Sequence, residues 1–311
     1  MLDVIIPTFN EEDNIEPLYK ELSNTLKNVK YNLIFIDDGS SDKTLSKLIK
    51  VYKKDTNRIK IISFTRNFGK DAAIYAGLKE AHSKYISIID SDLQQHPKHI
   101  LEMVEFLEKN EDYDEVAMVN SYSNDSFIQK KMKKCFYKLM TKLTHYNFEV
   151  GASDFRTIRN YVAKTLIDLK ETNRFTKGLF AWTGFNIKFL KYTPDKRLHG
   201  KSKFNFRKQI NYAIDGVLNF STSPMKIALY LGTTISTFSF IYLVYLIIKT
   251  LILGKDVPGF ASLMSVLLLL GGVILTMLGI IGEYVSRTYI EIKNRPIYIL
   301  KNKLGYDEDI L

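Results

Sequence analysis

The sequence predicts an α/β protein in which a doubly wound domain with a mostly parallel sheet is followed by a C-terminal hairpin of two transmembrane helices. Two observations predict this architecture. Over residues 1–120, short apolar runs alternate regularly with amphipathic helical patterns, as in a parallel sheet that helices cover on both faces. Further along, residues 227–248 and residues 257–282 contain no charged side chain.

The expected strands are near-continuous apolar runs, which suits strands buried on both faces of a sheet. They are residues 2–8, 31–36, 59–64, 85–89 and 115–119. The expected helices carry apolar residues at intervals of three and four. They are residues 11–26, 42–54, 70–81 and 97–108. Beyond residue 120 the alternation loosens, and the pattern predicts helices with one strand, residues 185–192.

Both uncharged stretches are long enough to cross a membrane. A bilayer core of roughly 30 Å requires about 20 apolar residues in a helix that rises about 1.5 Å per residue. The alternative, two core helices of a large globular domain, is disfavoured because buried helices rarely run this long without a charge. We therefore expect a domain over residues 1–222, the hairpin over residues 223–286 and a tail over residues 287–311.

The distribution of Lys and Arg predicts how the hairpin is oriented. Basic residues flank it on both outer sides, at Lys201, Lys203, Arg207, Lys208 and Lys226 before the first span and at Arg287, Lys293, Arg295, Lys301 and Lys303 after the second. The connection between the spans has few charges, Lys249, Lys255 and Asp256. Because basic flanks stay on the inner side, we expect a multi-pass protein of the cell membrane with the N-terminal domain and both termini in the cytoplasm.

The net charge of +10 is compatible with a nucleic acid or an anionic membrane as partner. Its distribution favours the membrane and no nucleic acid. Over residues 128–143, lysines interleave with apolar side chains at helical spacing, which predicts a basic amphipathic helix able to lie on an anionic leaflet. An ordinary surface helix packed on the domain is the open alternative. A single cysteine, Cys135, permits no intramolecular disulfide, which suits a reducing compartment.

Polar and acidic residues follow each of the first four expected strands. They are residues 7–12, 37–42, 66–70 and 90–92. Each segment by itself resembles an ordinary helix cap or turn. Because ligands bind at the carboxyl ends of the strands in an open α/β sheet, four such segments at successive strand ends predict one common binding crevice.

The central pair within these segments is Asp90 and Asp92, although Asp-x-Asp alone is a weak motif. Alternate residues of an extended segment share a side, so both carboxylates can approach one hard cation such as Mg²⁺ or Mn²⁺. Arg66 and Lys70 are cations able to hold a diphosphate, and Gly69 lets backbone amides approach the same oxygens. Neither a Gly-x-Gly-x-x-Gly turn after the first strand nor a P-loop motif occurs. An ordinary dinucleotide-binding domain and a P-loop domain are therefore disfavoured.

These four segments resemble family 2 glycosyltransferases with a GT-A fold. More narrowly, they resemble polyprenyl-phosphate glycosyltransferases, namely dolichol-phosphate mannose synthases and the bactoprenol glucosyltransferases of the GtrB type. Later segments that match the bacterial group are residues 154–156, 173–182, 200–204, 282–284 and 293–296. The resemblance covers nearly the whole chain. Three departures are Ser91, where alanine is usual, residues 118–122, where relatives tend to have arginines, and residues 95–97, which carry an extra glutamine, Gln95, before the proline.

The resemblance implies a role for each matching residue. The nucleoside pocket would be lined by Pro7, Thr8, Asn10, Glu12, Asp37 and Asp38. The metal would be surrounded by Asp90, Asp92 and Gln94. Phosphates of the donor or acceptor would be bound by Arg66, Lys70, Arg174, Lys201 and Ser202. Catalysis would depend on Asp92, Asp154 and Arg174. Asp154 is either a general base or a structural carboxylate paired with Arg156 or Arg174.

The implied reaction is inverting and metal-dependent. It moves a hexose from a nucleotide sugar, UDP-glucose or another UDP-hexose, to polyprenyl (undecaprenyl) phosphate at the cytoplasmic face of the membrane. Because a phosphate monoester is already ionised near neutral pH, the acceptor needs positioning by cations more than a strong base. The product would serve modification of cell-envelope glycans, with a flippase and a downstream glycosyltransferase as partners. The resemblance also implies a homo-oligomer, a tetramer.

Two alternatives belong to other functional classes. A processive polysaccharide synthase of the same fold carries a Gln-x-x-Arg-Trp motif, whereas the single tryptophan here, Trp182, follows Phe-Ala. An inactive membrane-tethered scaffold is disfavoured by the intact Asp90, Asp92, Arg66 and Lys70. A radiolabelled sugar-transfer assay distinguishes these two alternatives from the polyprenyl-phosphate transferase. Label would appear in lipid for the transferase, in polymer for the synthase and in neither for the scaffold.

Overall fold

The computed structural model describes residues 1–121, 141, 149, 151–195, 216–253 and 259–306. The chain divides into two compact units. Unit 1 comprises Met1–Gly216 and Pro296–Leu311, and unit 2 comprises Val217–Arg295. The expected basic helix over residues 128–143, together with Lys201 and Ser202, lies outside the described residues, apart from Thr141.

Unit 1 is built on an eight-stranded sheet with the order β7-β5-β6-β4-β1-β2-β3-β8. The strands are β1 (Leu2–Thr8), β2 (Tyr31–Asp37), β3 (Ile59–Phe64), β4 (Tyr85–Ile88), β5 (Glu115–Asn120), β6 (Ala152–Arg159), β7 (Ile187–Tyr192) and β8 (Leu300–Leu304). Among the described strands, β6 and β8 run antiparallel to their neighbours, and the remaining pairings are parallel. The predicted mostly parallel sheet is therefore confirmed.

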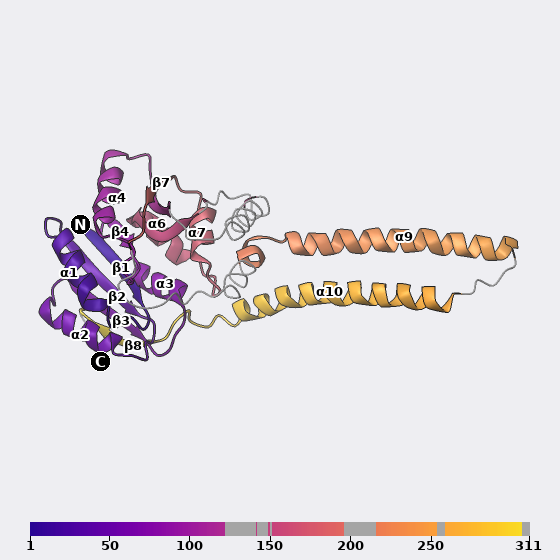
Figure 1. Ribbon diagram of the computed structural model, residues 1–311, viewed down its shortest axis with the longest axis horizontal. Helices are drawn as coiled ribbons and strands as arrows, with labels where there is room; N and C mark the ends of the chain where they lie inside the picture. The colour runs from indigo at the N-terminus through magenta and orange to yellow at the C-terminus, as the bar shows by residue number, and fades with distance from the viewer. Residues whose placement is uncertain (122–140, 142–148, 150, 196–215, 254–258, 307–311) are drawn as a thin grey trace. The chain divides into compact units, whose positions relative to one another are not determined.

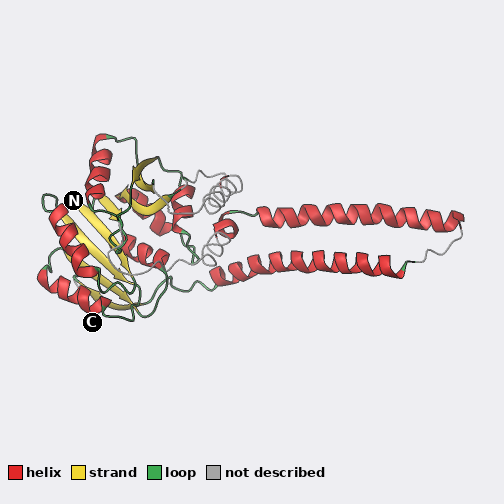
Figure 2. Ribbon diagram, in the orientation of Figure 1, coloured by secondary structure: helices red, strands yellow, loops and turns green. Residues whose placement is uncertain are grey.

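Helices cover this sheet on both faces (Figure 2). They are α1 (Ile15–Thr25), α2 (Thr44–Lys54), α3 (Lys70–Glu80), α4 (Lys98–Lys109), α6 (Asn160–Asp168) and α7 (Thr176–Trp182). Alternate residues of β1 separate the faces, as the two-residue period of a strand requires. Leu2, Val4 and Ile6 belong to the core cluster that includes buried residues of α1, α2 and α4. Ile5 points the other way, onto Gly77 of α3.

Two strands escaped sequence prediction. The pattern after residue 120 indicated one strand, but β6 is a second, inserted between β4 and β5. β8 follows the hairpin and pairs with the outer edge of β3 (Figure 1). Its sequence, LKNKL, lacks an apolar run because an edge strand needs only one covered face and tolerates lysine. Leu304 is buried, and Lys303 forms an ion pair with Glu80 at 3.0 Å.

Unit 2 contains α9 (Ser223–Leu253) and α10 (Phe260–Ile292). The candidate spans within them, Ser223–Ile252 and Ser262–Ile292, have mean hydropathies of 1.9 and 2.5, and none of either apolar window is buried within the described residues. Leu229, Phe238 and Leu275 are each more than 60% exposed. Side chains this apolar on a helix surface fit a lipid environment better than water. The length, composition and exposure of both helices thus agree with membrane association.

Candidate active site

The four polar segments singled out in the sequence meet at one edge of the sheet. β4, β1, β2 and β3 are neighbours and all run parallel. Their carboxyl ends therefore lie side by side, where ligands bind in folds of this class. Antiparallel β6 brings its first residues to the same edge. Its register pairs Arg156 with Ile88, and continued by two residues this register sets Asp154 opposite Asp90.

The loops after β1 and β2 are tied together by side-chain to backbone hydrogen bonds. The Ser40 hydroxyl accepts from the Asn10 amide at 2.9 Å, and the Asn10 side-chain oxygen accepts from the Ser41 amide at 2.8 Å. The Glu12 carboxylate accepts from the Lys43 amide at 3.0 Å. Asn10 has a φ of +52°, a conformation that asparagine tolerates better than most residues. Asn10 and Glu12 thus shape the rim of the predicted nucleoside pocket.

Asp37 and Asp38 are both buried beneath this rim. Asp37 accepts from the Ser63 hydroxyl at 2.8 Å and from the Ser40 amide at 3.1 Å. Asp38 accepts from the amides of Phe68 and Gly69 at 2.6 and 3.0 Å. Burial raises the pKa of Asp38 to about 6, against the lowering effect of these two amides. The two carboxylates therefore join the ends of β2 and β3 and fix the segment that leads into α3.

Pro7, Thr8 and Arg66 complete the predicted nucleotide side of the edge. Pro7 and Thr8 are the buried last two residues of β1, and the Thr8 hydroxyl donates to the Ile36 carbonyl at 3.0 Å. The Arg66 guanidinium lies 4.0 Å from the centroid of the Phe68 ring. Gly39 is required next to it, because a Cβ there would lie 2.3 Å from the Arg66 carbonyl carbon. Arg66 is thus held at the rim by its own backbone packing and remains exposed.

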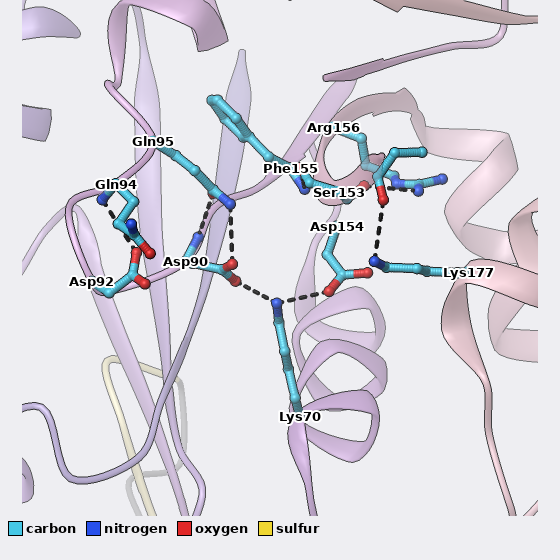
Figure 3. A network of polar contacts seen from close by, with 11 residues as sticks. Lys70, Asp90, Asp92, Gln94, Gln95, Ser153, Asp154, Phe155, Arg156 and Lys177 are labelled. Atoms are coloured by element: carbon cyan, nitrogen blue, oxygen red, sulfur yellow. Dashed lines mark hydrogen bonds and ion pairs between the residues drawn. The ribbon is translucent and has the colours of Figure 1, made fainter. Parts of the chain in front are cut away.

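The Lys70 ammonium bridges two carboxylates at the centre of the site (Figure 3). Its nitrogen lies 2.6 Å from Oδ1 of Asp90 and 2.7 Å from Oδ2 of Asp154. Burial by itself would lower the pKa of Lys70, but the charges of Asp154 and Asp90 raise that pKa above its ordinary value. Asp154 was predicted to be either a base or a carboxylate paired with an arginine. The ion pair is made with Lys70 instead.

Gln95 contacts Asp90 in the site, a role that the sequence analysis did not assign to it. Its side-chain oxygen accepts from the Asp90 amide at 2.9 Å, and its nitrogen donates to Oδ2 of Asp90 at 3.0 Å. It is 4% exposed. These two bonds fix the backbone and the carboxylate of Asp90. The carboxylate oxygen that Gln95 does not contact, Oδ1, faces Lys70. The sequence marked Gln95 only as an extra glutamine before Pro97, without a role.

Asp92 and Gln94 lie next to one another on the other side of Asp90 from Lys70 (Figure 3). Oδ1 of Asp92 accepts from the Gln94 amide at 3.2 Å. Among the described residues, no group of three or more His, Cys, Asp or Glu side chains is arranged to hold a metal ion. Two carboxylates and an amide oxygen are nevertheless hard donors of the kind that Mg²⁺ and Mn²⁺ use, with phosphate and water completing the shell. The donor set fits such an ion.

Basic groups surround Asp154 on its far side. Lys177 of α7 donates to the Ala152 carbonyl at 3.1 Å, and Arg156 donates to the Ser153 carbonyl at 3.2 Å. Burial would raise the pKa of Asp154, but the charges of Lys70 and Lys177 hold that pKa below its ordinary value. Asp154 is therefore a carboxylate at neutral pH and a weak proton acceptor.

Arg174 makes its described contacts away from these carboxylates. Its two terminal nitrogens donate to the carbonyls of Leu169 and Leu166 at 2.6 and 2.9 Å, and its guanidinium lies 4.5 Å from the Tyr75 ring centroid. It thereby satisfies carbonyls at the end of α6 that the helix itself cannot. Its predicted role at a phosphate stays a prediction, as do those of Lys201 and Ser202, which lie outside the described residues.

Known proteins resemble the chain over nearly its full length. The family model described as glycosyl transferase family 2 matches residues 3–167, and the one described as GtrB C-terminal hairpin matches residues 223–288. The chain is 41% identical over 309 residues to an uncharacterized glycosyltransferase of Synechocystis, covering 98% of this chain and 96% of the relative. It is 37% identical over 302 residues to a prophage-derived bactoprenol glucosyl transferase of Shigella flexneri, covering 96% and 97%.

Solved structures support the fold. Glucosyl-3-phosphoglycerate synthase from Mycobacterium tuberculosis, in complex with Mn²⁺, uridine diphosphate and phosphoglyceric acid, matches with a TM-score of 0.53 and 17% identity. The match covers 70% of this chain and 76% of that one. Together with the strand-end carboxylates and the two apolar helices, these matches show that the chain belongs to glycosyltransferase family 2 and carries a C-terminal hairpin of the GtrB type.

Proposed function

We propose that this protein transfers a hexose from a UDP-sugar, with UDP-glucose as the favoured donor, to a polyprenyl phosphate in the membrane. One observation carries the proposal: a strand-end site with the carboxylates of Asp90, Asp92 and Asp154 belongs to the same chain as two exposed apolar helices long enough to span a bilayer. A lipid acceptor explains why a nucleotide-sugar site is tethered to a membrane. The bactoprenol glucosyl transferases among the relatives support this acceptor class.

In the proposed reaction, an oxygen of the acceptor phosphate attacks the anomeric carbon of the sugar from the face opposite the diphosphate. The bond to the diphosphate breaks, its electron pair leaves with UDP, and the configuration inverts. A divalent ion held by Asp90, Asp92 and Gln94 would supply positive charge to the leaving diphosphate. The rim formed by Asn10 and Glu12 would hold the nucleoside, and Arg66 would contribute a further cation near the phosphates.

Asp154 does not need to remove a proton in this reaction. The acceptor phosphate has a second pKa of about 6, so its oxygen is already a nucleophile at neutral pH. The lowered pKa of Asp154 also makes it a poor base. We assign Asp154 the task of holding the Lys70 ammonium at the place where the sugar and the diphosphate separate.

We further propose that transfer takes place at the cytoplasmic face, with both termini inside. The Lys and Arg on both outer flanks of the hairpin support this orientation. The sugar-lipid product would then have to cross the bilayer before a second transferase used it outside, which is the reason to expect a flippase after this enzyme.

The test uses purified full-length protein in lipid nanodiscs with undecaprenyl phosphate and a panel of radiolabelled UDP-sugars. The expected result is organic-extractable label in a single lipid product, with UDP-glucose as the best donor. Label in material that stays at the origin as polymer would favour a processive synthase. Absence of label in both fractions for every donor would favour a scaffold without activity.

A further inference from the structure

We propose that Lys70 is a built-in counter-cation that competes with the divalent ion for Asp90, so that the ion binds well only when a nucleotide diphosphate draws the Lys70 ammonium away. This inference rests on the proposed function, from which it takes the divalent ion and the nucleotide diphosphate as ligands of the site. It concerns a coupling between the ion and the nucleotide that adds to the coupling produced when the diphosphate itself coordinates the ion.

The first support is that both carboxylate oxygens of Asp90 already have contact partners. Oδ1 lies 2.6 Å from the Lys70 ammonium, and Oδ2 accepts from Gln95 at 3.0 Å. Both carboxylate oxygens thus already have a positively charged or polar partner. A divalent ion such as Mg²⁺, coordinated by Asp90, would lie about 2.0–2.1 Å from its oxygen and therefore next to the ammonium. Two cations a few ångströms apart in a site that is partly shielded from water repel each other strongly.

The second support is the way in which the backbone fixes Lys70. The amides of Phe68 and Gly69 both donate to Asp38, and Gly69 has a φ of +99°, which favours glycine. On the other side, the Asp71 carboxylate accepts from the Thr176 amide at 3.0 Å. Lys70 therefore begins α3 between two anchored neighbours. Its ammonium reaches Asp90 and Asp154 without searching many backbone conformations.

The third support is that the Lys70 ammonium can move from Asp90 to an incoming phosphate. The Lys70 side chain is 41% exposed, and it lies on the segment after β3 that also carries Arg66. A diphosphate arriving at this edge brings its own negative charge. Lys70 could then leave Asp90 for a phosphate oxygen while it keeps its contact with Asp154. The nucleotide would both release Asp90 and add ligands to the ion, so each ligand should raise the affinity of the other.

The experiment measures Mn²⁺ binding from the electron paramagnetic resonance signal of free Mn²⁺, with full-length protein in detergent and with or without UDP. No acceptor and no sugar are present. Lys70→Met keeps the length of the side chain and removes its charge. We expect this variant to bind Mn²⁺ alone about 10-fold more tightly than the wild type, and we expect UDP to improve Mn²⁺ binding less in the variant than in the wild type.

Lys177→Met is the matched control. Lys177 also lowers the pKa of Asp154, but its ammonium donates to the Ala152 carbonyl, and its described contacts do not include Asp90. General removal of positive charge would tighten Mn²⁺ binding equally in both variants, whereas direct competition affects Lys70→Met alone. Lys70→Gln, which keeps a hydrogen-bond donor, serves as a second variant if Lys70→Met loses its thermal unfolding transition.

Equal Mn²⁺ affinity in wild type and both Lys70 variants would overturn the proposal, as would equal tightening by Lys177→Met. Failure of wild-type protein to bind Mn²⁺ even with UDP would overturn it too. The result is separable from the proposed function, because the binding assay includes no transfer. Sugar-lipid synthesis by the wild type, with unchanged Mn²⁺ affinity in Lys70→Met, would reject this inference alone. Tighter Mn²⁺ binding by Lys70→Met, without sugar-lipid synthesis by the wild type, would reject only the proposed function.

Discussion

The ring of Tyr298 stacks on the ring of Phe64, with centroids 4.7 Å apart and 20° between the planes. Phe64 ends β3, and Tyr298 lies just beyond the hairpin, in the segment that leads into β8. The Thr65 amide donates to the Ile299 carbonyl at 3.0 Å, and Tyr298 also contacts the edge of Tyr75 on α3. The segment after the membrane hairpin therefore supports the strand from which Arg66 and Lys70 follow.

Tyr298→Ala should destabilise unit 1 and loosen the segment after β3. The lost stacking and buried area correspond to about 3 kcal/mol. We expect a lower midpoint of thermal unfolding and UDP binding weakened by about 10-fold. Tyr289→Ala on α10, where the side chain is 60% exposed, is the control and should change neither. Unchanged unfolding and UDP affinity in Tyr298→Ala would show that the contact does not support the site.

The same contacts bear on membrane orientation. β8 follows the hairpin in sequence and pairs with β3, which precedes the hairpin. Both strands belong to unit 1, so the segments before and after the hairpin fold as one unit. We therefore expect both to lie on one side of the membrane. We expect a reporter inserted between Lys249 and Asp256 to be accessible from outside intact cells and a C-terminal reporter to be inaccessible. The opposite pattern would overturn the cytoplasmic placement.

Asp92→Asn should remove most transferase activity and leave the protein folded in the membrane, because it deletes one charge at nearly constant shape. We expect a loss of about 100-fold or more, and a similar loss for wild type in excess chelator, as measured by sugar transfer to lipid. Asp112→Asn, which changes an exposed carboxylate before β5, is the control. Full turnover by Asp92→Asn would reject the metal assignment.

The acceptor assignment predicts a flat dependence of rate on pH. Between about pH 7 and pH 8.5 a phosphate monoester is already ionised, so the wild type and Asp154→Asn should each keep a nearly constant rate. Lys201→Ala should weaken the use of lipid acceptor by raising its KM. A rate that rises steeply with pH in the wild type, and not in Asp154→Asn, would identify Asp154 as a base and favour a hydroxyl acceptor.

Buried Glu115 predicts how stability depends on pH. It lies on β5, 3.5 Å from Arg156, and burial raises its pKa to about 7 against the lowering effect of Arg156. The folded state therefore binds a proton more tightly than the unfolded state. The stability contributed by the protonated form is fully present below about pH 4.5 and is lost as the pH rises through about 7.

Glu115→Gln should flatten this decline by an amount on the order of 2 kcal/mol. The measurement is chemical unfolding of the purified protein at several values between about pH 4.5 and pH 8. Glu108→Gln, an exposed change on α4, should keep the wild-type slope. If Glu115→Gln also keeps that slope, the pKa of Glu115 is not raised in the folded state.

Local patterns in the sequence determined most elements and the place of the site. β1 and β3 have the predicted bounds, Leu2–Thr8 and Ile59–Phe64, because buried parallel strands need continuous apolar runs. Where α1 begins was less predictable. It starts at Ile15 instead of residue 11, because the amide of Glu11 donates to Thr44 across the chain. The hairpin was visible because lipid demands long uncharged helices.

Only the tertiary structure decided which strands meet and which charges pair. β6 and β8 join the sheet through edges offered by β4, β5 and β3, and such pairing depends on distant residues more than on local pattern. Lys70 was expected at a diphosphate, yet its ammonium contacts Asp154, 84 residues away in the chain, as well as Asp90. Sequence alone could place a cation at this edge. Its partner depended on the antiparallel register of β6, which brings a second carboxylate within 2.7 Å.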